Sequence, residues 1–289
     1  MLLAVDIGNT NITLGLFEGP LLQATWRLAT DVERTPDEYG VMLLSMLHQA
    51  GVDTSAVEAA VMCSSVPPLV AAVQELSERY FGVKPLVVDV GVRTGIRILY
   101  ENPREVGPDR VVDAVAAYRL YGGPVIVVDF GTATVFDAVS AEGDYLGGAI
   151  APGVGIAAEA LFQRAARLPR IELVPPPRAI GRTTVQSMQS GIIFGYVGLI
   201  EGIVARFRSE LGQSARVIAT GGLAPIVAPH SPCVDRVDLD LTLHGLRMIY
   251  DANTPGSGFR VPGSEPSPPA RSPEPRTQKA EPETRNPEP

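Results

Sequence analysis

The chain has 289 residues, a net charge of −8 and an apolar fraction of 45%. This length allows one large domain or two of ordinary size, and the acidity argues against nucleic acid as the main partner, because phosphate backbones favour clusters of lysine and arginine. No apolar run approaches the roughly 20 residues of a membrane span, and the N-terminus lacks a signal-peptide pattern. We therefore expect a cytoplasmic protein that contacts neither nucleic acid nor membrane.

The cysteines, histidines and lysines exclude several kinds of site. Cys63 and Cys233 have no metal-type spacing, and the three histidines are scattered, so neither a zinc site nor a histidine-based triad is expected. The two lysines, Lys84 and Lys279, do not follow a glycine-rich loop. The P-loop and the protein-kinase lysine are thereby excluded, because both need a lysine at a defined position.

Apolar periodicity predicts strands and helices in turn along the chain. The first part contains strands at 2–7, 12–17, 21–28 and 57–65 and helices at 36–50, 66–80 and 108–121. The second part contains three strands within 123–153, a strand at 215–220, a short helix after Gly221-Gly222, and helices at 153–167, 184–211 and 241–251. From about Thr254 the chain is rich in Pro, Glu, Ser and Gly, a composition typical of disorder.

The two parts of the chain carry a repeat. Asp6-Ile7-Gly8 matches Asp129-Phe130-Gly131, and each is followed by a polar turn, a strand and a Glu-Gly pair. The aspartate-to-glutamate spacing is 12 residues in the first copy and 13 in the second, which predicts a bulge on one side. Two unrelated hairpins can look alike, but a duplicated α/β fold explains more, because it places two Asp-x-Gly loops across a cleft from each other.

Such loops are suited to nucleotide phosphates. Glycine lets the backbone approach a phosphate closely, and the side chains of Thr10, Asn11, Thr13, Thr132 and Thr134 add neutral donors. A carboxylate beside phosphates requires a cation between them, so Asp6 and Asp129 indicate Mg²⁺ for the nucleotide, with a second ion as an option. Gly221-Gly222 can seat a flat ring such as adenine, although an ordinary strand-to-helix turn has the same pattern.

Five stretches stand out, in chain order "DIGNTN", "GPDR", "DFGTAT", "SMQSGI" and "ATGGLAP". Together they resemble type III pantothenate kinase, of the acetate and sugar kinase/Hsp70/actin superfamily. The likeness covers residues 2–253. It implies an α/β, duplicated ribonuclease H-like (actin-like ATPase) fold, in which two mixed-sheet domains face a central nucleotide cleft. The expected parts are an N-terminal half at 1–120, a C-terminal half at 121–253 and a Pro-rich tail at 254–289. The implied activity is ATP-dependent phosphorylation of pantothenate to 4′-phosphopantothenate, the first step of coenzyme A biosynthesis.

The resemblance also implies site residues, by position in this sequence. ATP, with Mg²⁺, is expected at Asp6, Ile7, Gly8, Asn9, Thr10, Asn11, Ile12, Thr13 and Thr132. A monovalent cation, K⁺ or NH₄⁺, is expected at Asp129. Pantothenate is expected at Tyr100, Gly107, Pro108, Asp109, Arg110 and Thr184, the last supplied by the partner subunit of a homodimer.

Three of these features have more than one interpretation. Asp109 matches the catalytic base, which suits a primary alcohol as substrate, yet an acidic residue also suits the first turn of a helix. Arg110 either pairs with the pantothenate carboxylate or points to solvent. Glycines at 191, 195, 198 and 202 predict close helix packing, either at a dimer interface or inside the core.

The chain departs from the family pattern in three places. Val135 stands where a second threonine is usual, Pro108 replaces a commoner alanine, and the tail is extra. Because Asp6, Asp109 and Asp129 are untouched, we expect an active enzyme. The alternatives are a sugar kinase of the same superfamily, and a regulatory protein that binds nucleotide without turnover.

Overall fold

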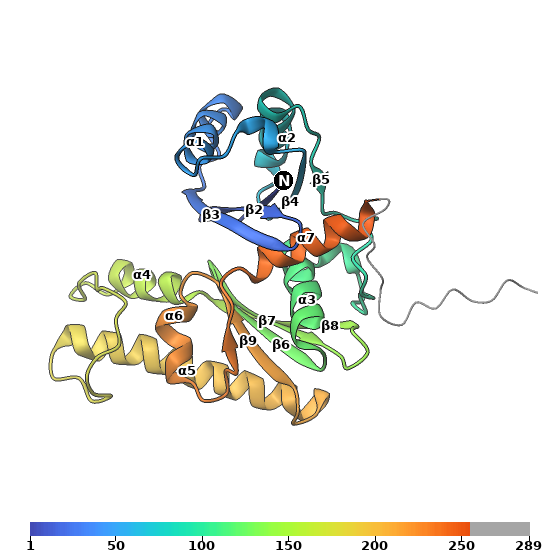
Figure 1. The fold of residues 1–289 in the computed structure, drawn as a ribbon. Coiled ribbons are helices and arrows are strands. Elements are labelled where there is room, and N and C mark those ends of the chain that lie inside the picture. Colours follow the sequence, from blue (N-terminus) through green and yellow to red (C-terminus); the bar gives the residue numbers. More distant parts are fainter. Residues whose placement is uncertain (255–289) are drawn as a thin grey trace, which may run out of the picture. The chain divides into compact units, whose positions relative to one another are not determined.

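Two five-stranded mixed sheets form the framework of the computed structural model, which describes residues 1–254 (Figure 1). The first sheet comprises β1 (Leu2–Ile7), β2 (Asn11–Glu18), β3 (Leu21–Ala29), β4 (Ala59–Ser64) and β5 (Leu86–Val87). The second comprises β6 (Val125–Phe130), β7 (Ala133–Val139), β8 (Tyr145–Pro152), β9 (Arg216–Thr220) and β10 (Arg236–Val237). Their orders, β3-β2-β1-β4-β5 and β8-β7-β6-β9-β10, are the same, so the duplicated α/β fold is confirmed.

Seven α-helices cover these sheets in the described part of the chain. They are α1 (Pro36–Gln49), α2 (Pro67–Phe81), α3 (Pro108–Tyr121), α4 (Val154–Arg164), α5 (Thr184–Leu211), α6 (Ala224–Val227) and α7 (Leu241–Asn253), with 3₁₀ turns at Thr54–Ala56, Pro103–Glu105 and Ala228–His230. α1 and α2 pack on one face of the first sheet, and α5 and α6 pack on one face of the second. α3 and α7 pack together between the sheets, and α3 contacts strands of both (Figure 1).

Side-chain alternation in β1 and β6 decides where the two aspartates point. Leu3 and Ile7 belong to the core beneath α1 and α2, whereas Leu2 and Ala4 belong to the core beneath α3 and α7. Since successive side chains of a strand point to opposite faces, Asp6 faces the α3–α7 layer. In β6 the same rule places Asp129 on the α3–α7 side, because Val125 and Val127 lie in that layer. Both carboxylates therefore face the middle of the molecule.

The hairpins differ in their turns. Asp6 pairs with Thr13 and Asp129 pairs with Val135, so the first loop is one residue longer than the second. A register shift occurs in both copies, at Leu16/Phe17 and at Ala138/Val139. The expectation of a bulge on one side alone is therefore wrong. The aspartate-to-glutamate spacing is one residue longer in the second copy because the β7–β8 connection, 140–144, is longer than the β2–β3 connection, 19–20.

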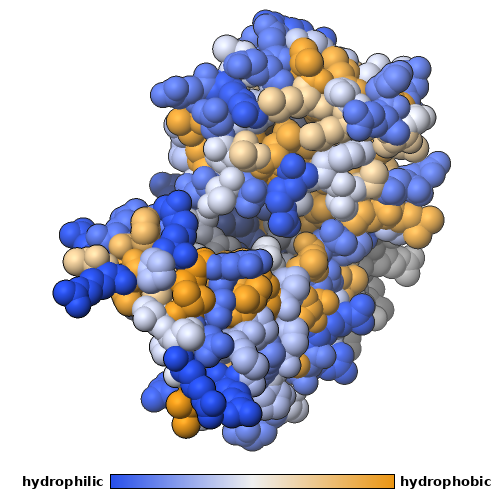
Figure 2. Space-filling view, turned by 90° about the vertical axis from the view of Figure 1, so that its left-hand side faces the viewer, coloured by the Kyte–Doolittle hydropathy of each residue, from blue (hydrophilic) through white to orange (hydrophobic). Residues whose placement is uncertain are grey.

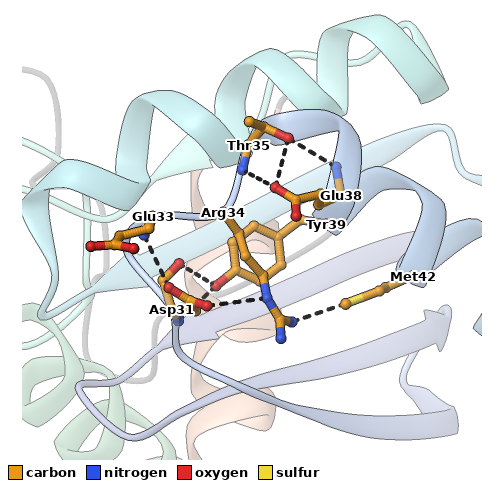
Figure 3. Close-up of polar contacts among 7 residues, drawn as sticks. All are labelled: Asp31, Glu33, Arg34, Thr35, Glu38, Tyr39 and Met42. Atoms are coloured by element: carbon orange, nitrogen blue, oxygen red, sulfur yellow. Dashed lines mark hydrogen bonds and ion pairs between the residues drawn. The ribbon is translucent and has the colours of Figure 1, made fainter.

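The connection from β3 to α1 supports the first loop. Thr35 and Glu38 form a capping box, in which the Glu38 N–H donates to Thr35 Oγ1 and the Thr35 N–H donates to Glu38 Oε2 (Figure 3). The Tyr39 hydroxyl bonds to the backbone of Asp31. The adjoining Thr30 donates from its hydroxyl to the Gly8 carbonyl at 2.6 Å. The segment that leads from β3 to the capped helix therefore holds the first Asp-x-Gly loop through Thr30.

Helix α5 contradicts the expectation that no apolar segment is as long as a membrane span. Among the described helices, it is the one long and apolar enough to cross a membrane, so the statement that no apolar run reaches that length is wrong for residues 184–211. Ile193, Ile200 and Val204 on this helix are buried in the second core, which is the core between the second sheet and helices α5 and α6. Those contacts make α5 a core helix.

Most predicted elements match the structure within a few residues. The sequence pattern does not predict β5 and β10, which have two residues each and are too short to show periodicity. The described residues form one compact unit, and the boundary expected at residues 120 and 121 stays a prediction. The expected tail, after Thr254, lies outside the described residues.

Candidate active site

A cavity of about 660 Å³ lies between the two sheets and is lined by residues of both. Figure 2 views the molecule from the left of Figure 1 and shows a hollow between its upper and lower parts. The cavity contains most of the residues expected to bind ATP or a cation, together with the expected base. These are Asp6, Gly8, Asn9, Thr10, Asn11, Thr13, Asp109, Asp129 and Thr132.

The first Asp-x-Gly loop is closed by its own backbone. The Gly8 N–H donates to the Asn11 carbonyl at 3.0 Å. The side chains of Ile7 and Ile12 are buried in the first core, so only their main chains can face a ligand. Thr10 Oγ1 and Thr132 Oγ1 are 2.8 Å apart and share a hydrogen bond. The repeat therefore brings the two loops together, as the sequence predicts.

The second loop differs from the expectation at Thr134. This residue pairs with Phe130, whose side chain lies in the second core, and it is fully buried. Alternation thus turns its hydroxyl away from the cavity, and its expected role as a donor there is wrong. Val135, the next residue, lines the cavity instead.

Gly221 packs closely against the end of β6, where the second loop begins. Its φ of +87° is a conformation that residues with a side chain rarely adopt. A Cβ at this position would also contact Asp129 Oδ1 and the Phe130 backbone. The glycine is therefore needed for close approach to Asp129, which is a more direct reason than the expected seat for adenine.

Four aspartates, Asp6, Asp109, Asp113 and Asp129, line the cavity, and their charges affect one another. Burial, followed by the charge of Asp109, raises the pKa of Asp6 to about 7. Burial, followed by the charge of Asp6, raises the pKa of Asp129 to about 7. Burial and Asp129 hold the pKa of Asp113 well above its usual range. Because an opposite charge nearby favours the ionised form of a carboxylate, a cation bound in this cavity would lower these pKa values.

The residues present fit a metal that arrives with the nucleotide. Within residues 1–254, no three His, Cys, Asp or Glu side chains are grouped closely enough to hold a metal ion. Mg²⁺ usually binds through one or two carboxylates, several waters and the substrate phosphates. Asp6 is suited to such a site, because it lies directly before the glycine of the first loop.

Asp109 lies in the first turn of α3, with one donor on each carboxylate oxygen. The Arg110 N–H donates to Oδ1 at 2.9 Å, and the Ser65 hydroxyl donates to Oδ2 at 2.6 Å. The carboxylate faces the cavity that both loops line. Its position thus allows a role beyond that of a first-turn acidic residue.

Arg110 does not point to solvent. Its Nε and Nη2 atoms donate to Asp137 Oδ1 at 3.0 and 2.7 Å, and only 12% of its side chain is exposed. The Tyr145 hydroxyl donates to the same oxygen at 2.7 Å. Burial raises the pKa of Asp137 although Arg110 opposes this change. The solvent-exposed interpretation of Arg110 is therefore wrong.

The remaining residues expected to bind pantothenate lie outside the cavity lining. Tyr100 stacks at a tilt on Tyr145, with 6.4 Å between ring centroids, next to the Arg110–Asp137 pair. Gly107 and Pro108 begin α3 beside Asp109. Thr184 is exposed at the start of α5.

Sequence reasoning missed several cavity residues. Asp113 lies one helical turn beyond Asp109, so the i, i+4 spacing on α3 could have indicated it. Arg27 is the basic residue among the described cavity-lining side chains, on a strand whose alternation predicts its face. Ser65 comes from a segment with no motif of its own, and only the folded chain brings it and Thr242 of α7 to the cavity.

Comparisons with known proteins identify the family. The model of the type III pantothenate kinase family matches residues 2–206. The type III pantothenate kinase of Moorella thermoacetica is 56% identical over 254 residues, which cover 88% of this chain and 100% of that protein. The chain belongs to the type III pantothenate kinase family. The enzyme of Myxococcus xanthus, also a type III pantothenate kinase, is 54% identical over 253 residues, covering 88% of this chain and 99% of that one.

Solved structures support the fold. A conserved putative Baf family transcriptional activator from Campylobacter jejuni has a TM-score of 0.56 at 19% identity, covering 87% of this chain and 98% of that one. A putative 2-dehydro-3-deoxygalactonokinase from Sinorhizobium meliloti has a TM-score of 0.54 at 14% identity, covering 88% and 100%. At such identities the likeness shows the fold alone.

Membership of the family gives the reaction. The protein transfers a phosphoryl group from ATP to an alcohol group of pantothenate, in coenzyme A biosynthesis. ATP and a divalent metal ion are the cofactors of such a kinase. The cavity shared by the two loops is the part of the described chain suited to this chemistry.

Proposed function

We propose that Asp109 is the general base of pantothenate phosphorylation. The observation that carries this proposal is its position, since its carboxylate lines the cavity formed by the two Asp-x-Gly loops. A primary alcohol must lose its proton as it attacks the γ-phosphoryl group. In a loose phosphoryl-transfer transition state, the base acts mainly by orienting the alcohol, which matches a carboxylate held by one donor on each oxygen.

The first loop, Asp6 to Thr13, binds the ATP phosphates in this proposal, and Thr132 binds them from the second loop. The Thr10 and Thr132 hydroxyls, 2.8 Å apart, can both donate to phosphate oxygens. Asp6 would hold Mg²⁺ beside the phosphates, and the bound ion would supply the positive charge that offsets negative charge during transfer. Arg27 adds a positive charge on the same side.

Asp129 holds the monovalent cation, K⁺ or NH₄⁺. Asp129 is not in an ion pair within residues 1–254, and burial, followed by the acidic groups around it, raises its pKa. A monovalent cation, which lacks the strict octahedral geometry of Mg²⁺, would suit a position with a single carboxylate better than a second Mg²⁺. The Asp137 carboxylate is not available for such an ion, because Arg110 and Tyr145 already donate to it.

Pantothenate binds beside Asp109, at Tyr100 and at Gly107 to Arg110. The Asp137 carboxylate engages two nitrogens of Arg110, and a guanidinium has five donors. The donors that Asp137 does not use can take the pantothenate carboxylate. The ring of Tyr100, next to this pair, forms an apolar wall for the substrate.

A homodimer completes the proposal, with Thr184 of one subunit contacting pantothenate in the other. Apart from adjacent residues and the nearby backbone of the helix itself, no atom lies within 4 Å of the point where a Cβ would stand at Gly191, Gly195 or Gly198, so packing against other elements of the subunit does not explain these glycines. They form an exposed strip on α5, on the same helix face as exposed Thr184, which lies 7, 11 and 14 residues before them. A second α5 can approach such a strip closely. We also propose that the enzyme acts in the cytoplasm.

The test is ADP release by the purified protein with ATP, Mg²⁺ and pantothenate, in K⁺ or in Na⁺, beside Asp109→Asn. We expect turnover that needs pantothenate and K⁺ and falls about 10²–10⁴-fold in the variant. Full turnover by Asp109→Asn would contradict the base. Equal rates in K⁺ and Na⁺ would contradict the cation, and ATP binding without turnover would indicate a regulatory protein.

A further inference from the structure

Ser65 makes the shortest side-chain contact to the proposed base. It lies in the connection between β4 and α2, a segment that carries none of the family motifs. Its hydroxyl donates to Asp109 Oδ2 at 2.6 Å, a length typical of a hydrogen bond to an ionised oxygen. Both residues line the active-site cavity.

The backbone around Ser65 is fixed on both sides. The Ser65 N–H donates to the Ile7 carbonyl at 2.9 Å, which continues the β1–β4 ladder past its last pair. The preceding Ser64 hydroxyl is 3.0 Å from both the N–H and the carbonyl of Val66. Val66 is buried, and Pro67 begins α2. The hydroxyl of Ser65 is therefore presented from a rigid turn.

Asp109 is held against the same corner by its own helix. The Arg110 N–H occupies Oδ1, and a Cβ at Gly107 would stand 2.5 Å from that oxygen. The carboxylate thus lies close to the chain on one side, and the Ser65 hydroxyl fixes the other oxygen. Without Ser65, rotation about the Asp109 side chain would be opposed by one hydrogen bond instead of two.

We propose that Ser65 is a positioning residue for the base, a role that rests on the proposed function of Asp109. Its hydroxyl orients the carboxylate so that the free lone pairs face the alcohol. Because the Ser65 backbone is bonded to Ile7, at the start of the first loop, the turn also sets the distance between the base and the bound phosphates. Proton transfer stays with Asp109, and Ser65 keeps its own proton throughout.

The first experiment compares three variants by steady-state kinetics. Ser65→Ala should lower kcat about 10- to 100-fold, the cost of a misplaced catalytic group, and leave KM for ATP and pantothenate within about twofold. Ser65→Thr, which keeps the hydroxyl, should recover most of the loss. Ser55→Ala is the matched control, because it removes another 2.6 Å serine–aspartate bond, at the exposed Asp53. It should behave as wild type.

The second experiment removes the base. In an Asp109→Ala background there is no carboxylate to position, so adding Ser65→Ala should change the residual rate less than about twofold. Thermal unfolding of each variant checks that the fold is intact. A full additional loss in the double variant, or a change confined to KM, would overturn the role of Ser65 alone. Full activity of Asp109→Ala itself would instead overturn the base, and with it this inference.

Discussion

Asp6 and Asp129, two of the carboxylates that line the cavity, occupy the same position in the repeat but have different neighbours. Asp6 pairs with Thr13 on the hairpin side and with Cys63 on the parallel side. Asp129 pairs with Val135 on the hairpin side and with Thr220 on the parallel side. The threonine that pairs with the aspartate therefore lies on the hairpin strand in the first copy and on the parallel strand in the second. The duplicated backbone keeps each carboxylate in place, while the adjacent strands give the two positions different ligand sets.

The largest expected change in activity comes from removing each of these two carboxylates in turn. Asp6→Asn and Asp129→Asn should each lower kcat about 100-fold or more, because each removes charge that stabilises bound cations and the transition state. Only Asp129→Asn should lose the difference between K⁺ and Na⁺. ADP release in the two salts, with enough enzyme to measure residual rates, checks this. Retained K⁺ activation in Asp129→Asn would assign the ion elsewhere.

A second difference is the charge on the outer hairpin strand. Arg27 pairs with Thr13, whereas the equivalent partner of Val135 is Ile150. Arg27→Ala should raise KM for ATP about tenfold, the size of one lost charge-assisted hydrogen bond, with KM for pantothenate little changed. Ile150→Ala is the matched control and should leave both constants near wild type. A rise in KM for pantothenate alone would move Arg27 to the other substrate.

The raised pKa values of Asp6 and Asp129 predict a stability that depends on pH. Each pKa is about 7 in the folded protein, above the ordinary 3.8, so the folded state binds extra protons. Their contribution is full at acidic pH and is lost as pH rises through about 7. The ligand-free Tm should fall by a few degrees as pH rises from the ordinary pKa of 3.8 to the folded-state pKa of about 7. Each kcal/mol of lost stability lowers Tm by about 2–4 °C. Mg²⁺ and K⁺, which bind the ionised forms, should oppose the fall.

Replacing both carboxylates separates these two groups from the rest of the protein. In the Asp6→Asn/Asp129→Asn variant, the decrease of Tm toward alkaline pH should flatten. An unchanged pH profile in that variant would mean that other groups cause it.

The smallest test exchanges the hairpin neighbours. Val135→Thr gives the second copy the hydroxyl that Thr13 supplies in the first, and should lower the K⁺ concentration for half-maximal activity about two- to threefold, as one weak hydrogen bond would. Thr13→Val is the reverse exchange and should leave the K⁺ response unchanged. K⁺ titrations of both variants measure this. An equal effect of the two would show that the cation does not distinguish the hairpins.

The sequence predicts the elements and both loops because these depend on local patterns. The period of two in β1 and β6 decides which way Asp6 and Asp129 point, and the Asp-x-Gly repeat indicates that they meet. The neighbours of Asp109 could not be predicted in this way. Ser65 is 44 residues away along the chain, and its contact depends on how the β4–α2 turn packs against α3.

Two errors have different physical origins. The sequence pattern predicts a cavity-facing Thr134 because the residue is polar and close to Gly131, but the alternation of its own strand turns it into the core. The solvent-exposed alternative for Arg110 follows from its place at the start of a helix, but Asp137 on β7 lies opposite and neutralises it. The first error is therefore visible in the local pattern, whereas the second depends on a residue of another element, which a local pattern does not contain.

The identical strand orders also bear on how such a site can arise. Each sheet supplies one loop, so one copy of the repeat carries one of the two Asp-x-Gly loops and the aspartate that begins it. A single-copy chain would need a second molecule, turned to face it, to enclose a nucleotide. Joining the copies in one chain makes that meeting independent of protein concentration. It also frees each copy to change its own neighbours, as Thr13 and Val135 have done.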